Sequence, residues 1–161
     1  MLIRKTKITD ISECVNIYNA AREYMRASGN PDQWPSCYPG EVDVLSDIAS
    51  GCGYVCEDKG EVVAVFYFAK GPDTTYAKIY DGAWKSDEPY AVIHRVAVKY
   101  HGRGIIDFIF NECFTTSGHL RIDTHKDNLP MQKVLKRNGF EPCGIIHIET
   151  GVERIAFEKT K

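Results

Sequence analysis

The alternation of apolar and polar residues divides the chain into helical and extended segments. From Ile11 to Met25, apolar side chains recur at helical spacing, and Asp10 with Glu13 before them resembles a capping box. Further helices are expected at about 42–49 and from 104 to about 116. A last helix is expected after Asn128, which would cap it, with Pro130 in its first turn and Asn138-Gly139 at its end.

Extended segments separate these helices. Residues 2–8 predict a first strand, and two hairpins are expected around Asp58-Lys59-Gly60 and around "TGV" near the end of the chain. "YAVIHRVAV" and "HLRIDTH" predict the fourth and fifth strands, while residues 29–41 and 72–89 are irregular connections. The resulting order, β-α-α-β-β-β-α-β-α-β-β, predicts an α/β protein with helices on both faces of one sheet.

Composition restricts the function classes. A length of 161 residues favours one domain over 1–161, and a net charge of −2 argues against a nucleic-acid or membrane partner. The N-terminus lacks the apolar core of a signal peptide, so we expect a cytoplasmic protein. Six cysteines occur without a Cys-x-x-Cys pair and five histidines without His-x-x-x-His spacing, so no metal site is expected.

The turn "HGRGI" between the fourth strand and the following helix is the first candidate for chemistry. The first backbone N–H groups of a helix, here from Arg103 to about Ile106, have no partner inside the helix. Gly102 and Gly104 would let an anion approach this end closely, and Arg103 or His101 could add positive charge. A diphosphate site is therefore weighed against a simple turn between buried elements.

The stretches "AVKYHGRGIIDFIF" and "DNLPMQKVLKRNGFEPCGI", in this strand order, resemble the GNAT N-acetyltransferases over residues 2–159. The resemblance implies the GNAT fold. That fold has a central mixed, mostly antiparallel sheet of about seven strands, splayed between the fourth and fifth strands and flanked by about four helices. It also implies transfer of an acetyl group from acetyl-CoA to a primary amine of a small molecule, an amino acid or a peptide.

The resemblance further implies where acetyl-CoA binds. Its pyrophosphate would lie on the turn, its pantetheine arm beside the fourth strand, and Asn128 would contact the arm. The implied cofactor-contacting residues are Val96, Ala97, Val98, His101, Gly102, Arg103, Gly104, Ile105, Ile106 and Asn128. The amine would attack the thioester directly, while a main-chain N–H of the fourth strand stabilises the oxyanion.

Candidate acids and bases lie on the two strands that splay. Asp123 and His125 are two residues apart and would share one face of the fifth strand. His94 would share a face with Val96 and Val98. A histidine near neutral pKa can relay the proton that an amine loses, and His125, at the strand end, is the preferred candidate. Each of the three is weighed against a purely structural, hydrogen-bonded role.

The acceptor pocket is expected from the two long connections. One contributes Asp32 and Gln33, and aromatic rings with a carboxylate suit a cationic amine. The expected acceptor-binding residues are Trp34, Tyr38, Tyr80, Asp81, Trp84 and Tyr90. The two tryptophans could equally seal the open end of the sheet.

Three positions depart from the family pattern. His101 and Ile106 replace the usual ends of the turn, and Leu135 stands where a tyrosine often protonates the leaving thiolate. These departures favour an alternative, a non-catalytic acyl-CoA-binding or regulatory domain on the same fold; a small interaction module is a third possibility. Hairpins at both ends leave sheet edges that could pair, so a homodimer is plausible.

Overall fold

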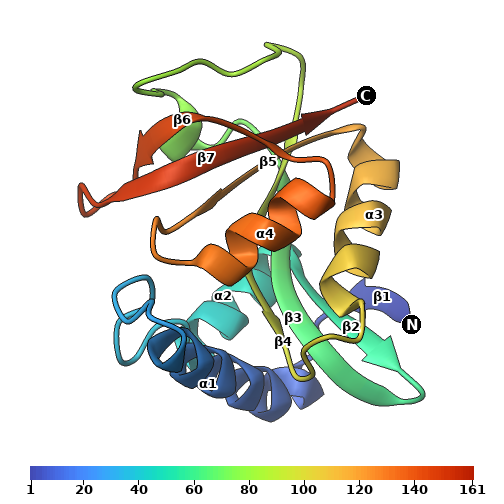
Figure 1. Cartoon of the computed structure of the whole chain (residues 1–161). Coiled ribbons are helices and arrows are strands. Elements are labelled where there is room, and N and C mark those ends of the chain that lie inside the picture. Colours follow the sequence, from blue (N-terminus) through green and yellow to red (C-terminus); the bar gives the residue numbers. More distant parts are fainter.

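The computed structural model describes residues 1–161 and contains one seven-stranded sheet in the order β1-β2-β3-β4-β5-β7-β6 (Figure 1). Only the β4–β5 pair is parallel, and the other five neighbouring pairs are antiparallel. The mixed, mostly antiparallel sheet predicted from the resemblance is therefore confirmed. The strands are β1 (Leu2–Lys5), β2 (Gly53–Asp58), β3 (Glu61–Lys70), β4 (Ala91–Val98), β5 (His119–Thr124), β6 (Glu141–His147) and β7 (Glu153–Thr160).

Four α-helices cover the two faces of the sheet, as the element order predicted. They are α1 (Ile11–Ala27), α2 (Glu41–Ser50), α3 (Ile105–Ser117) and α4 (Leu129–Arg137). Two short 3-10 helices, Ile8–Asp10 and Thr74–Tyr76, complete the set. None of the helices is long and apolar enough to cross a membrane.

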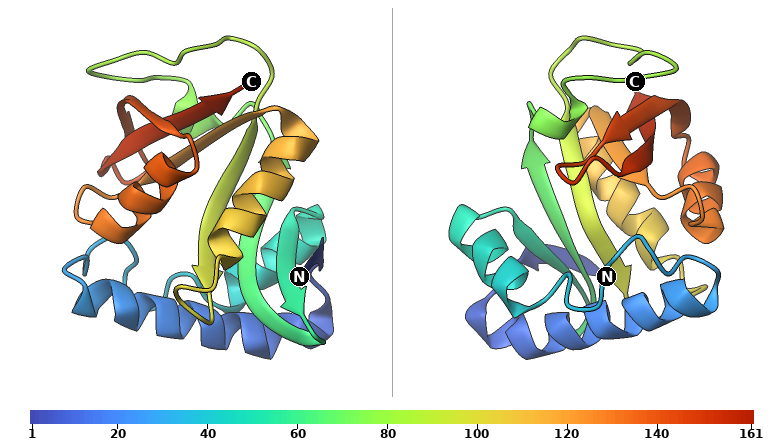
Figure 2. Two further views of the ribbon diagram at one scale, coloured as in Figure 1. Left: turned by 45° about the vertical axis from the view of Figure 1, so that its right-hand side comes forward. Right: turned by 90° about the vertical axis from the view of Figure 1, so that its left-hand side faces the viewer.

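Two buried clusters show which helices share a face. Residues of α1 and α2 pack with Val55, Val65 and Ala97 of the sheet, whereas α3 and α4 pack against the opposite face around Phe66 and Ile93. The two views of Figure 2 show the same division, with α1 and α2 lying apart from α3 and α4. On the α1 face, the 71–90 connection covers the half of the sheet that α1 and α2 leave open, through Tyr76.

The predicted splay lies between β4 and β5. These strands pair only at Ala91–Leu120 and Val92–Arg121, although β4 continues to Val98 on its other side against β3. The main chain of β4 beyond Val92 therefore has no strand partner on the β5 side. An opening of this kind exposes backbone donors and acceptors inside the sheet, where a ligand can bind them.

A β-bulge at Arg95 corrects one prediction made from alternation. Arg95 has a φ of 51°, and the β3–β4 register shifts at this position. Beyond the bulge, Val96 packs in the α3 cluster, while the ring of His94 lies against Tyr67 and Tyr76 on the α1 face. The extra residue shifts the alternation of side chains between the two faces of the sheet, so His94 does not share a face with Val96 and Val98.

The start of α1 also differs from the prediction. Asp10 lies at the N-terminal boundary, but its side chain makes no capping hydrogen bond to the helix. Its carboxylate instead accepts from the Lys7 N–H at 2.8 Å and from Arg4 at 2.7 Å. Asp10 therefore ties β1 to the connection that follows, and the expected capping box with Glu13 is not formed.

Candidate active site

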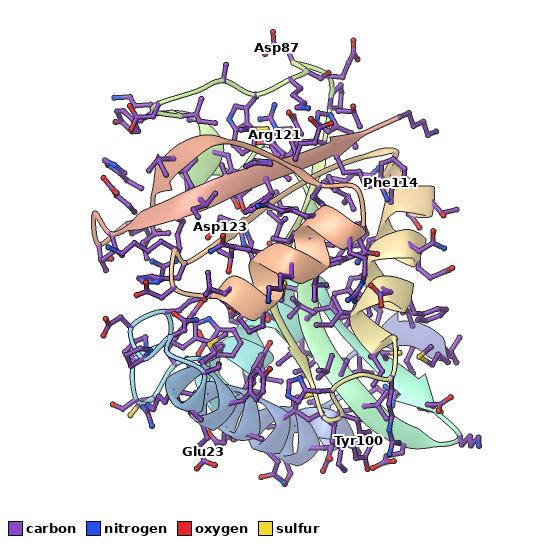
Figure 3. All side chains as sticks on the ribbon, viewed as in Figure 1. Glu23, Asp87, Tyr100, Phe114, Arg121 and Asp123 are labelled. Carbon is purple, nitrogen blue, oxygen red and sulfur yellow. The ribbon has the colours of Figure 1, made fainter.

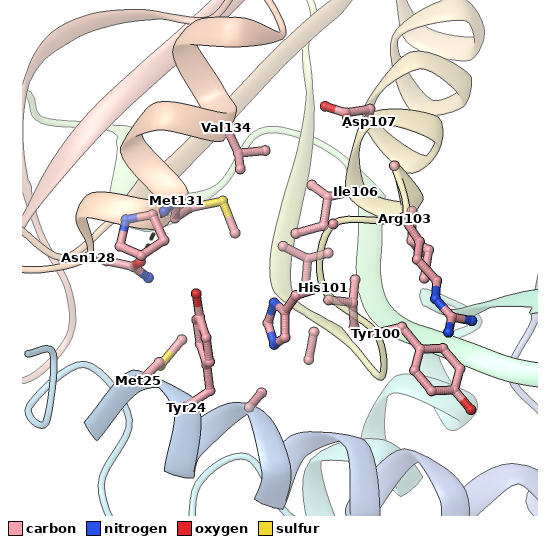
Figure 4. Close-up of a pocket in the computed structure, with 18 of the residues that line it drawn as sticks. Tyr24, Met25, Tyr100, His101, Arg103, Ile106, Asp107, Asn128, Met131 and Val134 are labelled. Carbon is pink, nitrogen blue, oxygen red and sulfur yellow. Dashed lines mark hydrogen bonds between the residues drawn. The ribbon is translucent and has the colours of Figure 1, made fainter. Parts of the chain in front are cut away.

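A cavity of about 480 Å³ lies between α1, the glycine turn and α4 (Figure 4). Apolar residues make up most of its wall, and Val96, Ala97 and Val98 of β4 line it. Each of the ten residues that the resemblance assigned to acetyl-CoA lines this cavity: Val96, Ala97, Val98, His101, Gly102, Arg103, Gly104, Ile105, Ile106 and Asn128. The structure thus brings together residues that stand more than thirty positions apart in the sequence.

The glycine turn has the geometry that an anion site requires. The first bond of α3 runs from the Phe108 N–H to the Gly104 carbonyl at 3.0 Å, so the N–H groups of the three preceding residues have no helical acceptor. Gly102 and Gly104 have φ values of 73° and 70°, which favour glycine. No atom lies within 4 Å of a Cβ built on Gly102, so the turn is open where a phosphate would approach.

The Asp107 carboxylate beside the turn is paired with groups at the end of α4, which offset part of its negative charge. Arg137 and Asn138 of the α4 end donate to the Asp107 carboxylate at 2.8 and 2.6 Å. Burial raises the pKa of Asp107, but these hydrogen bonds outweigh it and the net pKa is lowered. Arg103 lies over the Tyr100 ring at 4.3 Å and points away from the cavity in Figure 4.

The main chain of Val96 and Val98 faces the splay. Lys99 donates its N–H to the Val63 carbonyl at 2.8 Å, and hydrogen-bonded positions alternate along an antiparallel pair. Ala97 therefore pairs with Val65 of β3, and the N–H and C=O groups of Val96 and Val98 point the other way. No β5 residue pairs with them, so they remain available to an extended ligand such as a pantetheine arm.

Asn128 has both ends of its side-chain amide engaged. Its Oδ1 accepts from the Met131 N–H at 3.1 Å and so caps α4, as the sequence predicted. Its Nδ2 donates to Oε1 of Gln33 at 2.8 Å. The second N–H of Nδ2 and the second lone pair of Oδ1 remain available for a contact with a cofactor arm.

A second cavity, of about 830 Å³, lies on the other side of the splay. It is lined by residues of the 28–40 connection, residues 73–75, the middle of β4, the end of β5 and the β6–β7 loop. Four residues line both cavities: Met25, Val96, Asn128 and Met131. The cavities therefore meet at the splay, beside the exposed main chain of Val96.

Two carboxylates flank His94 in this second cavity. His94 Nε2 lies 2.7 Å from Asp73 Oδ2, and its Nδ1 lies 3.8 Å from Asp123 Oδ1. Burial raises the pKa of Asp73, but hydrogen bonds from His94 and Thr75 lower it to a net value of about 2. An ionised Asp73 accepts from Nε2–H, which leaves Nδ1 on the side of Asp123 to take up or release a proton.

The structure separates His125 from the other two predicted catalytic residues. β5 ends at Thr124, so strand alternation does not extend to His125, and its side chain lines neither of the two cavities. Its Nδ1 accepts from the Asp127 N–H at 3.1 Å. Burial lowers the pKa of His125, with a further contribution from Arg154. The second cavity is therefore lined by Asp123 and His94 but not by the preferred histidine.

The predicted acceptor-binding residues divide between two places. Trp34 and Tyr38 line the second cavity, together with Asp32 and Gln33 of the same connection. The four from the other connection, Tyr80, Asp81, Trp84 and Tyr90, do not line it. Trp84 and Tyr90 instead enclose the Arg121 guanidinium, at 4.1 and 4.0 Å from their ring centres.

The enclosed arginine explains why these rings lie elsewhere. Arg121 is 5% exposed and donates to Glu158 Oε1 at 3.0 Å, so the rings shield a buried ion pair. Figure 3 shows Arg121 beneath the 71–90 connection, with Asp87 at its outer tip. This connection therefore closes the end of the sheet. Leu135, the position of the family tyrosine, is fully buried in the α3 cluster.

Two residues of the second cavity were not predicted. Asp73 follows β3, and the Asp-Thr-Thr sequence that lets it cap the 74–76 helix was a detectable signal. On β7, Arg154 and Glu158 lie on the same strand face as the buried Ala156. Charged residues on an otherwise buried strand face were the signal that could have revealed them. No group of three metal-ligating side chains is present.

Comparison with solved structures finds relatives with the same fold. An acetyltransferase of the GNAT family from Streptococcus agalactiae is 27% identical, with a TM-score of 0.91 over 99% of this chain and 95% of that one. One from Listeria monocytogenes is 18% identical, with a TM-score of 0.67 over 98% and 93%. A ribosomal-protein-alanine N-acetyltransferase from Brucella melitensis is 17% identical, with a TM-score of 0.65 over the full length of both chains.

No family model and no curated protein matches the sequence. The splayed seven-stranded sheet and the solved structures nevertheless confirm the resemblance found in the sequence. The chain has the GNAT fold and resembles the GNAT acetyltransferases along its whole length.

Proposed function

We propose that the protein is an N-acetyltransferase that moves an acetyl group from acetyl-CoA to a primary amine within a ternary complex. One observation carries the proposal: the cavity on the glycine turn and the cavity beside Asp123 meet at the splay of β4 and β5. A thioester held along Val96 and an amine held in the second cavity would then be adjacent, and such positioning supplies much of the rate of an acyl transfer.

The residues present fit acetyl-CoA. Free N–H groups at the start of α3 suit its pyrophosphate, and the exposed main chain of Val96 and Val98 suits its amide-containing arm. Together these groups would hold the thioester at the splay. We therefore assign acetyl-CoA to the 480 Å³ cavity as cosubstrate.

The acceptor side supplies the acid–base chemistry. The ammonium group of the acceptor first gives a proton to Asp123 or, through it, to His94, whose other nitrogen is held by Asp73. The free amine nitrogen then bonds to the thioester carbonyl carbon. The nitrogen, positively charged after this attack, loses its second proton to solvent. The C–S bond breaks, and the sulfur leaves as a thiolate that takes up a proton from solvent, because Leu135 has none to donate.

A thermal melt with and without acetyl-CoA tests the cosubstrate assignment, with dephospho-CoA and ADP as partial ligands. Saturation at one hundred times the dissociation constant would stabilise the protein by about 2.7 kcal/mol, which is roughly 5–10 °C for this size. Gly102→Ala should reduce the shift, because its Cβ would enter the path to the turn.

Gly60→Ala is the matched control. Gly60 also has a positive φ and no atom within 4 Å of a built Cβ, but it lies in the β2–β3 hairpin and lines neither cavity. Both variants carry a similar backbone cost, so only the ligand shift should separate them. No shift at millimolar acetyl-CoA would refute the proposal. A shift without thiol release in the presence of any amine would favour the non-catalytic acyl-CoA-binding alternative.

A further inference from the structure

The second cavity contains a buried cation and a carboxylate that face each other without a hydrogen bond between them. Arg154 is 6% exposed, and its Nε lies 4.0 Å from Asp123 Oδ2, beyond hydrogen-bond distance. Its two terminal nitrogens donate to main-chain carbonyls, those of Glu153 at 3.2 Å and Gln33 at 3.1 Å. The guanidinium is thus held in place, yet Nε has no acceptor.

The Asp123 carboxylate across this gap also has an oxygen without a hydrogen bond. Asp123 Oδ1 accepts from the Tyr76 hydroxyl at 2.7 Å, but Oδ2 accepts no hydrogen bond. Arg154 Nε and Asp123 Oδ2 therefore both have hydrogen-bonding capacity left for a ligand in the cavity.

Three other buried or half-buried arginines pair closely with carboxylates, whereas the buried Arg22 donates to the main-chain carbonyls of Tyr38 and Pro39 and to Asn19. Arg95 lies 2.6 Å from Asp47, Arg121 lies 3.0 Å from Glu158, and Arg4 lies 2.7 Å from Asp10. Arg154 and Asp123, by contrast, stand 4.0 Å apart without a hydrogen bond between them, and both residues line the second cavity. The guanidinium is held in place, and the carboxylate can accept further hydrogen bonds. The two together are complementary to a ligand that carries an ammonium group and a carboxylate close to each other.

We propose that the acceptor is a free α-amino acid, whose ammonium group binds Asp123 Oδ2 and whose carboxylate binds Arg154 Nε. This inference rests on the proposed acetyl transfer and names its substrate class. The ammonium group would lie on the residue that takes its proton before attack. A peptide N-terminus and a simple alkylamine lack the carboxylate, so they would leave Arg154 unpaired in the complex and the desolvated guanidinium would penalise binding.

The test compares matched acceptors on the wild-type enzyme: a panel of free amino acids, the corresponding amino-acid amides, and the corresponding decarboxylated amines. Thiol release from acetyl-CoA gives kcat/KM for each. We expect each preferred amino acid to exceed its amide and its amine by at least about tenfold, because one charged hydrogen bond is lost in each. Equal values across the three forms would overturn the inference while leaving acetyl transfer intact.

Substitutions of Arg154 test whether this residue causes the preference for free amino acids. Arg154→Gln should raise KM for the amino acid more than tenfold and leave the amide nearly unchanged, so that the preference disappears. Arg154→Lys keeps the charge and should retain part of the preference, which separates recognition from a general loss of folding. Lys133→Gln removes an exposed charge outside both cavities and serves as the control.

Two other outcomes have distinct meanings. A preference for amino acids that survives in Arg154→Gln would overturn the assignment of the carboxylate to Arg154. A thermal shift with acetyl-CoA, but no thiol release with any acceptor of the panel, would refute both the amino-acid inference and the catalytic part of the proposed function. The cosubstrate site would then stand alone.

Discussion

The side-chain amide of Asn128 donates to Oε1 of Gln33 across 2.8 Å. This hydrogen bond links a residue that lines both cavities to the connection that forms part of the wall of the second. Gln33 Oε1 also accepts from Asn30 at 2.8 Å, and both asparagines are buried. One oxygen on the 28–40 connection therefore satisfies two buried donors, one of them at the N-terminus of α4. The wall that holds Trp34 and Tyr38 is fixed by the residue that caps that helix.

Gln33→Ala should destabilise the fold and weaken acceptor binding. It leaves two buried amide donors without an acceptor, at a cost of about 2 kcal/mol, or roughly 4–8 °C in Tm. Gln33→Glu keeps an oxygen in place and should recover most of the loss. Gln132→Ala, which removes a hydrogen bond to the exposed Lys126 carbonyl, is the matched control. Equal melting curves for the two alanine variants would contradict this role of Gln33.

Comparison of three histidine variants tests the proton relay. His94→Gln should lower kcat by about 100-fold, the size expected for loss of a general base, without changing the thermal shift by acetyl-CoA. His125→Gln should cause a smaller loss, because that side chain lines neither cavity. His147→Gln, on the exposed ring stacked against Tyr80, controls for loss of an imidazole. A larger loss for His125 would restore it as the principal candidate.

Asp73 should make the stability depend on acid pH. Its pKa is lowered in the folded protein to about 2, from 3.8, so its contribution is present above pH 4 and is lost as the pH falls through about 2. The lowering corresponds to about 2 kcal/mol. Asp73→Asn should therefore lower the free energy of unfolding by this amount at pH 7. Urea titrations of both proteins at pH 7, 4 and 2 check this, and a gap between them that does not narrow at pH 2 would be contrary evidence.

The Glu158–Arg121 pair should be important for stability. Glu158→Gln leaves a buried guanidinium without its counter-charge between Trp84 and Tyr90, and should cost about 3 kcal/mol, or roughly 6–12 °C. Burial raises the pKa of Glu158, but donors from Lys85, His119 and Arg121 outweigh it and lower the net pKa, so the carboxylate is charged at pH 7. Glu141→Gln breaks an exposed pair with Lys85 and should change Tm little. Similar changes in Tm for the two variants would show that the buried ion pair contributes no more to stability than the exposed one.

The sequence alone determined the elements and the cosubstrate side of the candidate site. The periods of apolar residues, the cap at Asn128 and the glycines around Arg103 are local signals, because each depends on residues within a few positions of each other. The ten residues assigned to acetyl-CoA by resemblance lie around one cavity because the turn, the strand before it and the α4 cap are positioned by these local structures.

Only the tertiary structure decided the acceptor side. Alternation placed His94 with Val96, but a bulge at Arg95, which no local pattern announced, turned His94 to the other face. The aromatic connection around Trp84 packs over Arg121, where it covers the buried ion pair between β5 and β7. Arg154 and Gln33, 121 positions apart, meet through a hydrogen bond that depends on the packed sheet and therefore cannot be inferred from either segment alone.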